Sequence, residues 1–547
     1  MSFEFDWLIV GSGFGGSVSA LRLAEKGYSV GVLECGRRFA DDEFPKSTGD
    51  VRRYLWSPKL GMKGIFRMTF FKDVTVASGS GVGGGSLGYA CTLYVPPKQF
   101  FEDRQWRSMN DWEGALAPHY AEAQRMLGVT ENPYEDPADQ LLRELGEELG
   151  VGDTYKRTPV GIYFGEAGKT VEDPFFGGEG PDRTGCMRCG RCMIGCVHGA
   201  KNTLVKNYLY FAERHGVKIM PERTVIDVRP LGRGDGSDGY EVESIRSGSW
   251  FGAERRVQRA RGVVVAAGAL GTNRLLALCR EKGSLPRISP RLGDLVRTNS
   301  ESILTVTVPE DYEDDLTRRV AITSSIYPDP HTHIETVTYG DGGNSMRVLY
   351  TLLTGDGTRL TRPLKLFAQL IRHPGRTARI LFPKHWSRRT IIILVMQTLD
   401  NSMSLRPRRG PFGMFRLQTE QDSESPNPTF IPVANRAAEW FAKRTGGIAQ
   451  SAVTEALFNI PTTAHFLGGA VIGADSSSGV VDAHQCVFGY ENLLVCDGAA
   501  VPANVGVNPS LTITALAEHA MSHVPNSDRV AAAAGDAAAH GAPRHSV

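Results

Sequence analysis

Four cysteines in one short segment have the clearest spacing for chemistry in this sequence. Cys186, Cys189, Cys192 and Cys196 follow the pattern C-x2-C-x2-C-x3-C. A loop with this spacing can direct four thiolates at an iron–sulfur cluster, as in bacterial ferredoxins. No proline follows Cys196, and in ferredoxins the fourth cysteine of such a run serves a second cluster. Three interpretations stay open: an iron–sulfur cluster, a zinc or other metal knot, and free thiols.

A glycine triplet near the N-terminus predicts a dinucleotide site. Gly11, Gly13 and Gly16 have the G-x-G-x-x-G spacing between an apolar run at 7–10 and a segment of helical periodicity. Gly11 permits a tight turn, Gly13 lets the backbone approach a pyrophosphate, and Gly16 lets helix and strand pack closely. The phosphates would lie at the positive helix N-terminus. Glu34, about 20 residues farther on, can accept hydrogen bonds from a ribose diol. The triplet alone does not distinguish NAD from FAD.

A second glycine-rich segment follows a predicted strand at 74–77. Five glycines occur between positions 79 and 85. Without side chains, their backbone N–H groups can close on a planar or phosphorylated ligand. The alternative is a flexible surface loop, and the apolar residues on both sides favour the ligand-binding interpretation.

These two segments and a C-terminal block resemble the glucose–methanol–choline (GMC) oxidoreductases, which are FAD-dependent enzymes that oxidise alcohols. The matching motifs are GVGGGSL at 81–87, HFLGG at 465–469, DG at 497–498 and NPSLTITA at 508–515. The resemblance runs from about residue 6 to residue 520, with gaps. Within the family it is greatest for the bacterial cholesterol oxidases, especially the mycobacterial type.

The resemblance implies bound FAD, which is long and needs several contacts along the chain. It assigns the adenine to the backbone near Val225, and it implies a further close approach at the small residues of 266–272. An Asn that contacts the flavin in the family is missing from GYAC at 88–91. Cys91 in that segment is predicted to be a packed thiol rather than a covalent flavin attachment point. The predicted cofactor-binding residues are Gly11, Gly13, Phe14, Gly16, Glu34, Gly81, Gly85, Ser86, Val225, Asp497, Gly498 and Asn508.

By the same resemblance, His465 and Asn508 would face the reactive side of the flavin. Hydride transfer from an alcohol carbon leaves a hydroxyl proton, which an imidazole can orient and help to remove. The amide of Asn508 can hold the hydroxyl or polarise the flavin edge without titrating. Many GMC enzymes have His at the second position, whereas cholesterol oxidases have Asn. The pair therefore favours a sterol-like secondary alcohol.

Cholesterol oxidases also move a ring double bond, with a Glu of the substrate domain as the base. An alignment anchored on Leu349-Tyr350 puts Asn344 at that position. Asp341 and Glu335 are the nearest carboxylates upstream, and Glu335 is interpreted as a solvent-facing strand residue. Isomerisation is therefore an extension of the main hypothesis.

The hypothesis is an oxidase that converts a steroid 3β-hydroxyl to a ketone, with O2 as acceptor. One alternative is a dehydrogenase whose four-cysteine loop relays electrons to a quinone or a protein carrier. Two others are an oxidase of long-chain or terpenoid alcohols and a flavin-holding, steroid-binding protein with little turnover.

The elements that would position these residues predict an α/β protein. A Rossmann-like FAD-binding domain is expected from 1–110, 185–296 and 462–524, with an insertion or cap at 111–184. Alternating, β-branched runs after residue 297 predict an α+β substrate domain at 297–461 built on an antiparallel sheet. The Ala-rich tail at 525–547 is predicted to be disordered.

The segment from Gly357 to Leu399 contains no acidic residue but many arginines and lysines among large apolar residues. It predicts either a basic amphipathic element that rests on an anionic membrane or a solvated helical face.

Bulk properties exclude some classes. Over 547 residues the formal net charge is +1, so a globally basic nucleic-acid binder is not expected. No signal peptide or membrane-spanning run is visible. We therefore expect a cytoplasmic protein that can also bind the surface of a membrane.

Overall fold

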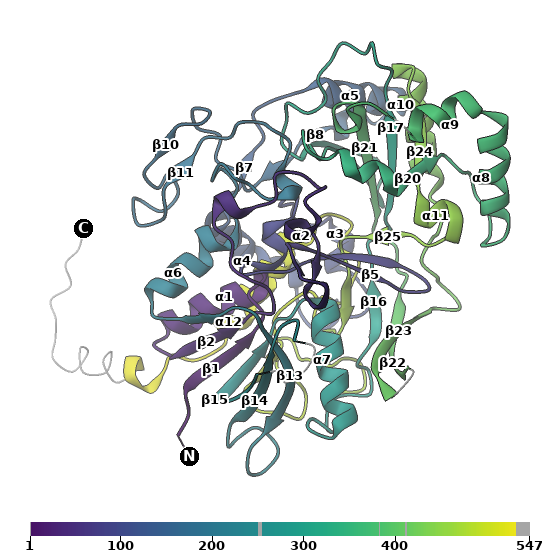
Figure 1. Ribbon diagram of the computed structural model, residues 1–547. Coiled ribbons are helices and arrows are strands. Elements are labelled where there is room, and N and C mark those ends of the chain that lie inside the picture. The colour runs from purple at the N-terminus through teal and green to yellow at the C-terminus, as the bar shows by residue number, and fades with distance from the viewer. Residues whose placement is uncertain (1, 250–253, 382, 411–412, 532–547) are drawn as a thin grey trace.

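The computed structural model describes residues 2–249, 254–381, 383–410 and 413–531. Two layered units share the chain (Figure 1). The lower unit in this view is built on a mainly parallel sheet, and the upper unit on an antiparallel sheet. Among the described residues, no helix is long and apolar enough to cross a membrane.

The first sheet contains strands from both ends of the chain. Its order is β12-β2-β1-β15-β14-β13, and β27 also pairs with β15. β1, β2, β12, β15 and β27 run parallel to one another, whereas β14 is antiparallel to both of its neighbours, β13 and β15. The strands are β1 Phe5–Val10, β2 Val30–Leu33, β12 Lys218–Met220, β13 Arg223–Pro230, β14 Tyr240–Arg246, β15 Arg255–Val265 and β27 Leu493–Val495. This parallel core, with a helix after β1, confirms the predicted Rossmann-like unit.

Four helices of this unit pack against one another, and a fifth packs separately against the sheet. α1 contacts α12 and α6, and α12 contacts α4, while α7 packs against β13. Together with the sheet they bury one large apolar core. The helices are α1 Phe14–Glu25, α4 Trp112–Met126, α6 Tyr208–Arg214, α7 Ala269–Lys282 and α12 Ser510–Ser522.

The second sheet is antiparallel, as predicted for the residues after 297. Its order is β20-β24-β17-β21-β19-β18-β8. The strands are β8 Lys156–Arg157, β17 Ser302–Thr307, β18 Ile322–Asp329, β19 Thr332–Val337, β20 Tyr350–Leu352, β21 Thr390–Gln397 and β24 Ile448–Ala452. The strand β20 is short, because residues Asn344–Leu349 form a 3-10 helix directly before it.

Both faces of this sheet are covered. Ile391, Ile393 and Val395 of β21 pack in a core with α5, Pro137–Glu148, and α10, Pro432–Thr445. The intervening residues Ile392, Leu394 and Met396 face the opposite side, where they form a second core. Successive side chains of a strand point to opposite faces, so the second face carries the residues that look toward the cofactor unit.

Smaller elements connect the units. β25, Thr462–Thr463, pairs with β6, Thr75–Gly79, which pairs with β5, Phe66–Phe70. A further small sheet has the order β23-β22-β16-β26, with β16 at Asp294–Arg297 and β26 at Leu467–Gly469. The remaining strands of that sheet are β22 Met403–Arg409 and β23 Phe415–Gln421.

Residues 111–184, predicted to be a cap, contribute to both units: α4 packs on α12, while α5 and β8 join the second sheet. The start of the predicted disordered tail is also packed. The N–H group of Ser527 donates to the carbonyl of Lys26, and Tyr28 Oη donates to the carbonyl of Pro525. Residues 532–547 of the predicted tail lie outside the described residues.

Candidate active site

The glycine turn between β1 and α1 is shaped by close backbone packing. Gly11 has φ +102°, and a Cβ there would collide with the carbonyl of Ala266 at the end of β15. A Cβ at Gly16 would collide with the carbonyl of Gly11. Gly13 differs, because no atom beyond its chain neighbours and its own helix lies within 4 Å of the position its Cβ would take. Gly13 is also the N-cap of α1 and has no side-chain cap. The helix N-terminus therefore opens onto free space suited to a phosphate group.

Glu34 directly follows β2 and lies beside this turn. Its carboxylate accepts hydrogen bonds from the N–H and Oγ of Ser12, at 3.1 and 2.8 Å, and from the N–H of Gly36 at 2.8 Å. The side chain is almost fully buried. These donors fix the carboxylate next to the glycine turn, where a ribose hydroxyl would complete its hydrogen bonds.

The second glycine-rich segment packs on the first. Gly81, Gly83 and Gly84 have positive φ, and a Cβ at Gly84 would lie 2.6 Å from the Cα of Gly13. Ser86 Oγ donates to the carbonyl of Gly83 and accepts from the N–H of Leu204. Gly85 lies beside the ring of Phe14. Residues of both glycine-rich segments were predicted to bind the cofactor, and in the structure the two segments pack against each other.

The third predicted cofactor contact comes from the C-terminal block. The carboxyl of Asp497 accepts from Thr272 Oγ1 at 2.5 Å and from the N–H of Ala499 at 2.7 Å. Burial raises the pKa of Asp497 to about 6. Its side chain therefore ties β27 to the start of α7, and the carbonyl of Asp497 accepts from the N–H of Ala500 at 3.1 Å. Val225 lies in β13, two strands from β15, at an irregularity of the β13–β14 pairing.

These elements fit FAD. The open volume over Gly13, the buried carboxylate of Glu34 and the glycine segment at 81–85 provide places for the pyrophosphate, a ribose and the flavin side of a long dinucleotide. A further sign of an absent partner is Asn508, which is buried and whose Oδ1 has no hydrogen-bond partner among the described residues.

His465 is held between the two units. It follows β25 and precedes β26, and its N–H donates to Thr463 Oγ1 at 2.9 Å. Its Nδ1 forms a hydrogen bond with Glu301 Oε1. The N–H of Gly468 donates to the carbonyl of Gly498 at 2.8 Å, so the histidine segment and the Asp-Gly turn are directly joined.

Asn508 meets a carboxyl of the substrate sheet. It lies just before α12, and its Nδ2 donates to Glu335 Oε2 at 3.5 Å, the upper limit for a hydrogen bond. Glu335 lies in β19 and is fully buried. Burial raises the pKa of Glu335 to about 8, the bond from Asn508 opposes this rise, and the charge of Glu301 adds to it.

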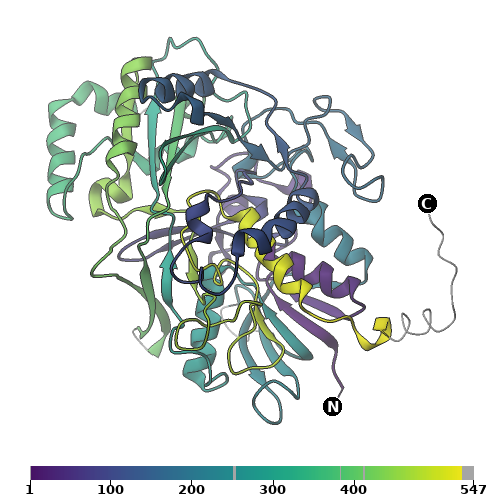
Figure 2. The same ribbon diagram turned by 180° about the vertical axis from the view of Figure 1, so that it is seen from behind.

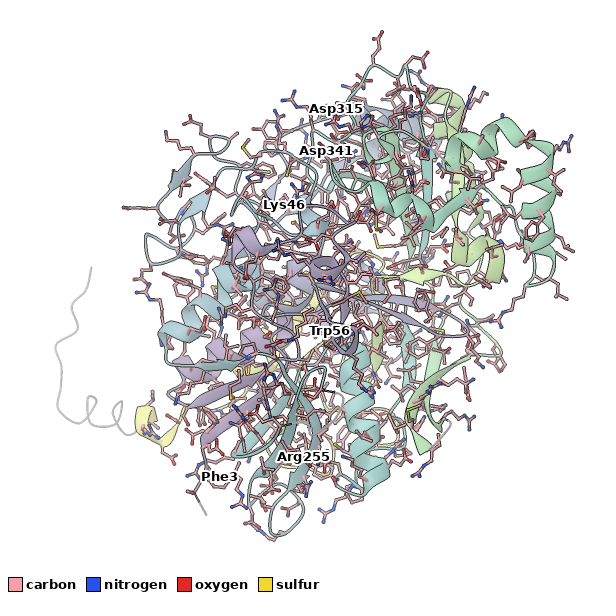
Figure 3. The ribbon with its side chains drawn as sticks, viewed as in Figure 1. Phe3, Lys46, Trp56, Arg255, Asp315 and Asp341 are labelled. Atoms are coloured by element: carbon pink, nitrogen blue, oxygen red, sulfur yellow. The ribbon has the colours of Figure 1, made fainter. Side chains whose placement is uncertain are left out.

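The interpretation of Glu335 as a solvent-facing residue is therefore wrong. The alternation of β19 does put Glu335 on the face opposite Ile334, but that face looks into the second core rather than into water. Asn344, which the alignment put at this position, is exposed and accepts from the N–H of Ser387 at 3.0 Å. Asp341, labelled in Figure 3, has a side chain that is 58% exposed and pairs with Arg388 at 2.8 Å.

His333 completes the buried polar face of β19. Its ring stacks on Tyr327 at 4.5 Å and meets Tyr94 edge-on at 5.0 Å. Burial lowers its pKa to about 3, and nearby His465 acts in the same direction. His333 is therefore neutral. Neither His333 nor Glu301 was predicted from the sequence, because no local motif marks them.

The segment at 88–91, where the family's Asn is missing, is buried. Cys91 is fully buried with φ 70° and packs against Val160 and Ile162. The Tyr89 ring meets the Phe14 ring edge-on at 5.5 Å, and Tyr89 Oη donates to the carbonyl of Asn202. Cys91 is thus a packed side chain, as predicted.

The four cysteines line one cavity. It is also lined by Lys201, Arg191, Arg319 and His198. Hydrogen bonding to Cys91 lowers the pKa of Cys192 to about 7, and the charge of Lys201 acts in the same direction. Among the described residues, no three His, Cys, Asp or Glu side chains are grouped closely enough to hold a metal ion. In the part of the chain that the structure describes, the geometry therefore shows no preformed site for either metal interpretation, the zinc knot or the iron–sulfur cluster.

The comparisons with known proteins agree with this geometry. Two models described as GMC oxidoreductase match residues 180–281 and 413–517. The chain is 52% identical over 537 residues to a cholesterol oxidase of Mycobacterium tuberculosis, covering 96% of this chain and 92% of the relative. It is 48% identical over 529 residues to a cholesterol oxidase of Acinetobacter baumannii, covering 96% of this chain and 95% of that relative.

A solved structure shows the same fold. Pyridoxine 4-oxidase from Mesorbium loti aligns with a TM-score of 0.59 at 16% identity, covering 94% of this chain and 98% of that one. Taken together with the two cholesterol oxidases, the matched models and the FAD-compatible site, this places the protein among FAD-dependent oxidoreductases that act on CH–OH groups. The chain belongs to the GMC oxidoreductase family.

Proposed function

We propose that this enzyme oxidises the 3β-hydroxyl group of a cholesterol-like steroid to a ketone. The observations that carry the proposal are two hydrogen bonds between the C-terminal block and the substrate sheet: His465 bonds Glu301, which directly precedes β17, and Asn508 bonds Glu335 of β19. The identity of about one half to cholesterol oxidases supports the choice of substrate. FAD, when bound, accepts the hydride of the alcohol carbon and passes the electrons to O2.

The protein's residues manage the hydroxyl group and its proton. His465 Nε2 accepts the hydroxyl proton, because the other ring nitrogen is engaged by Glu301. Asn508 holds the oxygen with its amide without changing charge. The buried setting excludes water, which strengthens both interactions. Anaerobic mixing of the purified holoenzyme with cholesterol tests this proposal: the flavin bleaches, and an unchanged flavin spectrum with every 3β-hydroxysteroid would refute the substrate.

We also propose that the ketone is isomerised to the 4-en-3-one, with Glu335 as the base that moves the proton. Its burial beside Asn508 supports this role.

A second candidate function concerns the electron acceptor. We propose that the four-cysteine cavity holds an iron–sulfur cluster, so that electrons can also leave to a quinone or a protein carrier. The ferredoxin-type spacing and the shared cavity support this. Lys201 is buried and donates to the carbonyls of Leu87, Tyr89 and Cys192 at 2.9–3.0 Å. No Asp or Glu is among the described residues that line the cavity. A buried ammonium without a carboxylate partner favours negative charge, which thiolates supply.

The cluster proposal predicts iron and acid-labile sulfide in anaerobically purified protein. Both should be lost in Cys189→Ser and in Cys192→Ser, because each removes a ligand, but retained in Cys486→Ser, which lies outside the loop. Elemental and sulfide analysis measures this, and steady-state turnover with a quinone and with O2 separates dehydrogenase from oxidase. Wild-type protein with full FAD and no iron would refute the cluster.

We further propose that α8, Thr361–Arg372, and α9, Pro374–Leu381, rest on an anionic membrane from which the steroid is taken. Leu360, Leu364, Phe367 and Ile371 share one helical face and are 54–81% exposed. The opposite side is anchored, since Leu366 and Ile380 pack with Leu352 and Ala456. The two helices stand at the outer edge of the molecule in both views (Figures 1 and 2).

The positive charge of these helices favours an anionic membrane as the partner of this surface. Arg372, Arg376 and Arg379 form no ion pair with any described residue, and each basic group near an anionic bilayer contributes about 1 kcal/mol. The variant Leu364→Asp/Ile371→Asp should reduce co-sedimentation with phosphatidylglycerol vesicles at least roughly tenfold, because burying each side chain is worth about 1.5–3 kcal/mol. Leu60→Asp changes a leucine of equal exposure, 68%, and should bind normally. Equal binding of wild-type protein to neutral and anionic vesicles would contradict the proposal.

A further inference from the structure

Glu301 makes two contacts with the segment that carries His465. Its Oε1 bonds the ring Nδ1, and its Oε2 accepts from the N–H of Ala464 at 3.0 Å. The Glu301 side chain is 1% exposed, and that of His465 is 11% exposed. One buried carboxylate therefore fixes both the ring and the backbone that carries it.

The backbone before Glu301 is held in an uncommon conformation. Asn299 and Ser300 have φ of 56° and 47°, in the left-handed region that few residues other than glycine adopt. Such a turn persists when surrounding contacts enforce it. Asn299 Oδ1 accepts from the N–H groups of Val505 and Gly506, at 3.0 and 3.1 Å, and its Nδ2 donates to the carbonyl of Val507 at 2.8 Å. The turn that aims Glu301 is thus fixed by the loop that ends at Asn508.

A third connection joins the segment before Glu301 to the segment that carries His465. Thr463 Oγ1 donates to the carbonyl of Thr298 at 3.1 Å and accepts from the N–H of His465 at 2.9 Å. These two hydrogen bonds of Thr463 fix the distance between the Glu301 turn and the His465 segment. They therefore keep the carboxylate and the imidazole ring within hydrogen-bond distance.

We propose that Glu301 is the positioning residue of His465, which it holds in the tautomer and orientation needed to accept the substrate proton. A carboxylate can only accept, so Nδ1 of the ring must carry a proton and donate it to Glu301. The second nitrogen, Nε2, is then left as an acceptor. After the substrate hydroxyl gives its proton to Nε2, the carboxylate faces an imidazolium and stabilises it, as the Asp of a Ser-His-Asp triad does.

The proposal rests on the proposed function for its chemical consequence. The hydroxyl proton passes to Nε2 of His465, while the hydrogen on the alcohol carbon leaves with its electron pair to FAD. Glu301 exchanges no proton and forms no bond with the substrate.

Other polar groups face this pair from β19 and from the start of α12. They are His333, which is neutral, Glu335, and Asn508. The negative charge of Glu301 raises the pKa of Glu335. Removal of the Glu301 charge should therefore also lower the pKa of Glu335, the carboxyl assigned to isomerisation.

The decisive variant is Glu301→Gln, which keeps the size of the side chain and removes its charge. We expect anaerobic flavin reduction by cholesterol to slow about 100-fold or more, by analogy with the loss of the acid in a His-carboxylate pair, with little change in the steroid concentration that gives half-maximal rate. The pH profile of the rate should also change, because the imidazolium that forms after proton transfer no longer faces a carboxylate. Glu301→Asp should recover part of the rate.

A matched control neutralises another buried carboxyl. Glu455 lies in α11, Val453–Phe458, and its nearest cation is Arg362 at 3.9 Å. Glu455→Gln should leave the rate and its pH profile unchanged. FAD content and melting temperature of each variant show whether the fold is retained.

A second measurement needs no substrate. A ring N–H that donates to a buried carboxylate gives a proton resonance far downfield in the NMR spectrum of the holoenzyme. We expect this resonance in the wild type and in Glu455→Gln, and its loss in Glu301→Gln and in His465→Ala. If the resonance is present but no steroid bleaches the flavin, the proposed substrate is wrong, whereas the pairing of Glu301 with His465 is retained. A Glu301→Gln variant with the wild-type resonance, rate and pH profile would overturn the proposal.

Discussion

Replacement of His465 by alanine is expected to slow anaerobic flavin reduction by cholesterol by about 10²–10⁴-fold, the range typical for loss of a general base. His465 is the only one of the predicted catalytic pair with a group that can take a proton, and its ring is already fixed through Nδ1. Stopped-flow absorbance of the flavin measures the rate directly, without a contribution from the reaction with O2.

The control for this experiment is an exposed histidine. His484 is exposed and its ring stacks on that of His523, and His484→Ala should reduce the flavin at the wild-type rate. Imidazole added to His465→Ala should restore part of the activity if the missing group is only a base. A His465→Ala enzyme that bleaches as fast as the wild type would remove the histidine from the mechanism.

The second large effect is expected at Glu335. Glu335→Gln should still oxidise cholesterol but release the 5-en-3-one, with isomerisation slowed by about 10²–10⁴-fold, because the amide cannot accept the ring proton. The growth of the conjugated enone in the ultraviolet spectrum, set against flavin reduction in the same sample, separates the two steps.

The pH dependence of the wild type follows from burial of this carboxyl. Because burial raises the pKa of Glu335 to about 8, the group is mostly protonated at neutral pH, and only its carboxylate form can act as a base. Isomerisation should therefore accelerate between about pH 7 and 9, and the rise should be absent in Glu335→Gln. Asp341→Asn changes an exposed carboxylate and should keep both the step and its pH profile. Normal isomerisation in Glu335→Gln would exclude Glu335 as the base.

The parts of the site that were predicted from the sequence have a local physical signature. Gly11 and Gly16 are required by backbone contacts between adjacent elements, so their spacing is visible in the chain. The C-terminal motifs at 497–498 and 508–515 are also local: they lie just after β27 and across the start of α12, where an Asn-Pro pair marks the helix boundary.

The parts that were not predicted depend on long-range packing. Glu335 alternates with apolar residues, which usually indicates a strand with one face in water. Here helices cover one face of the sheet and the cofactor unit covers the other, so a buried acid looks like a surface residue in the sequence. Glu301 is similar, since its partner is 164 positions away and its turn is formed by non-glycine residues that no turn motif identifies.

One strand has a consequence for how the protein is made. β15 pairs with β1 on one side and, over its last residues, with β27 on the other. A ribosome that adds about 5–20 residues per second needs roughly 25–100 s between β1 and β27. For that time the glycine turn lacks the segment that closes it. Retention of FAD is therefore a late event of biosynthesis, and a nascent chain stalled before residue 493 would be released without its cofactor, whatever the quality of its N-terminal motif.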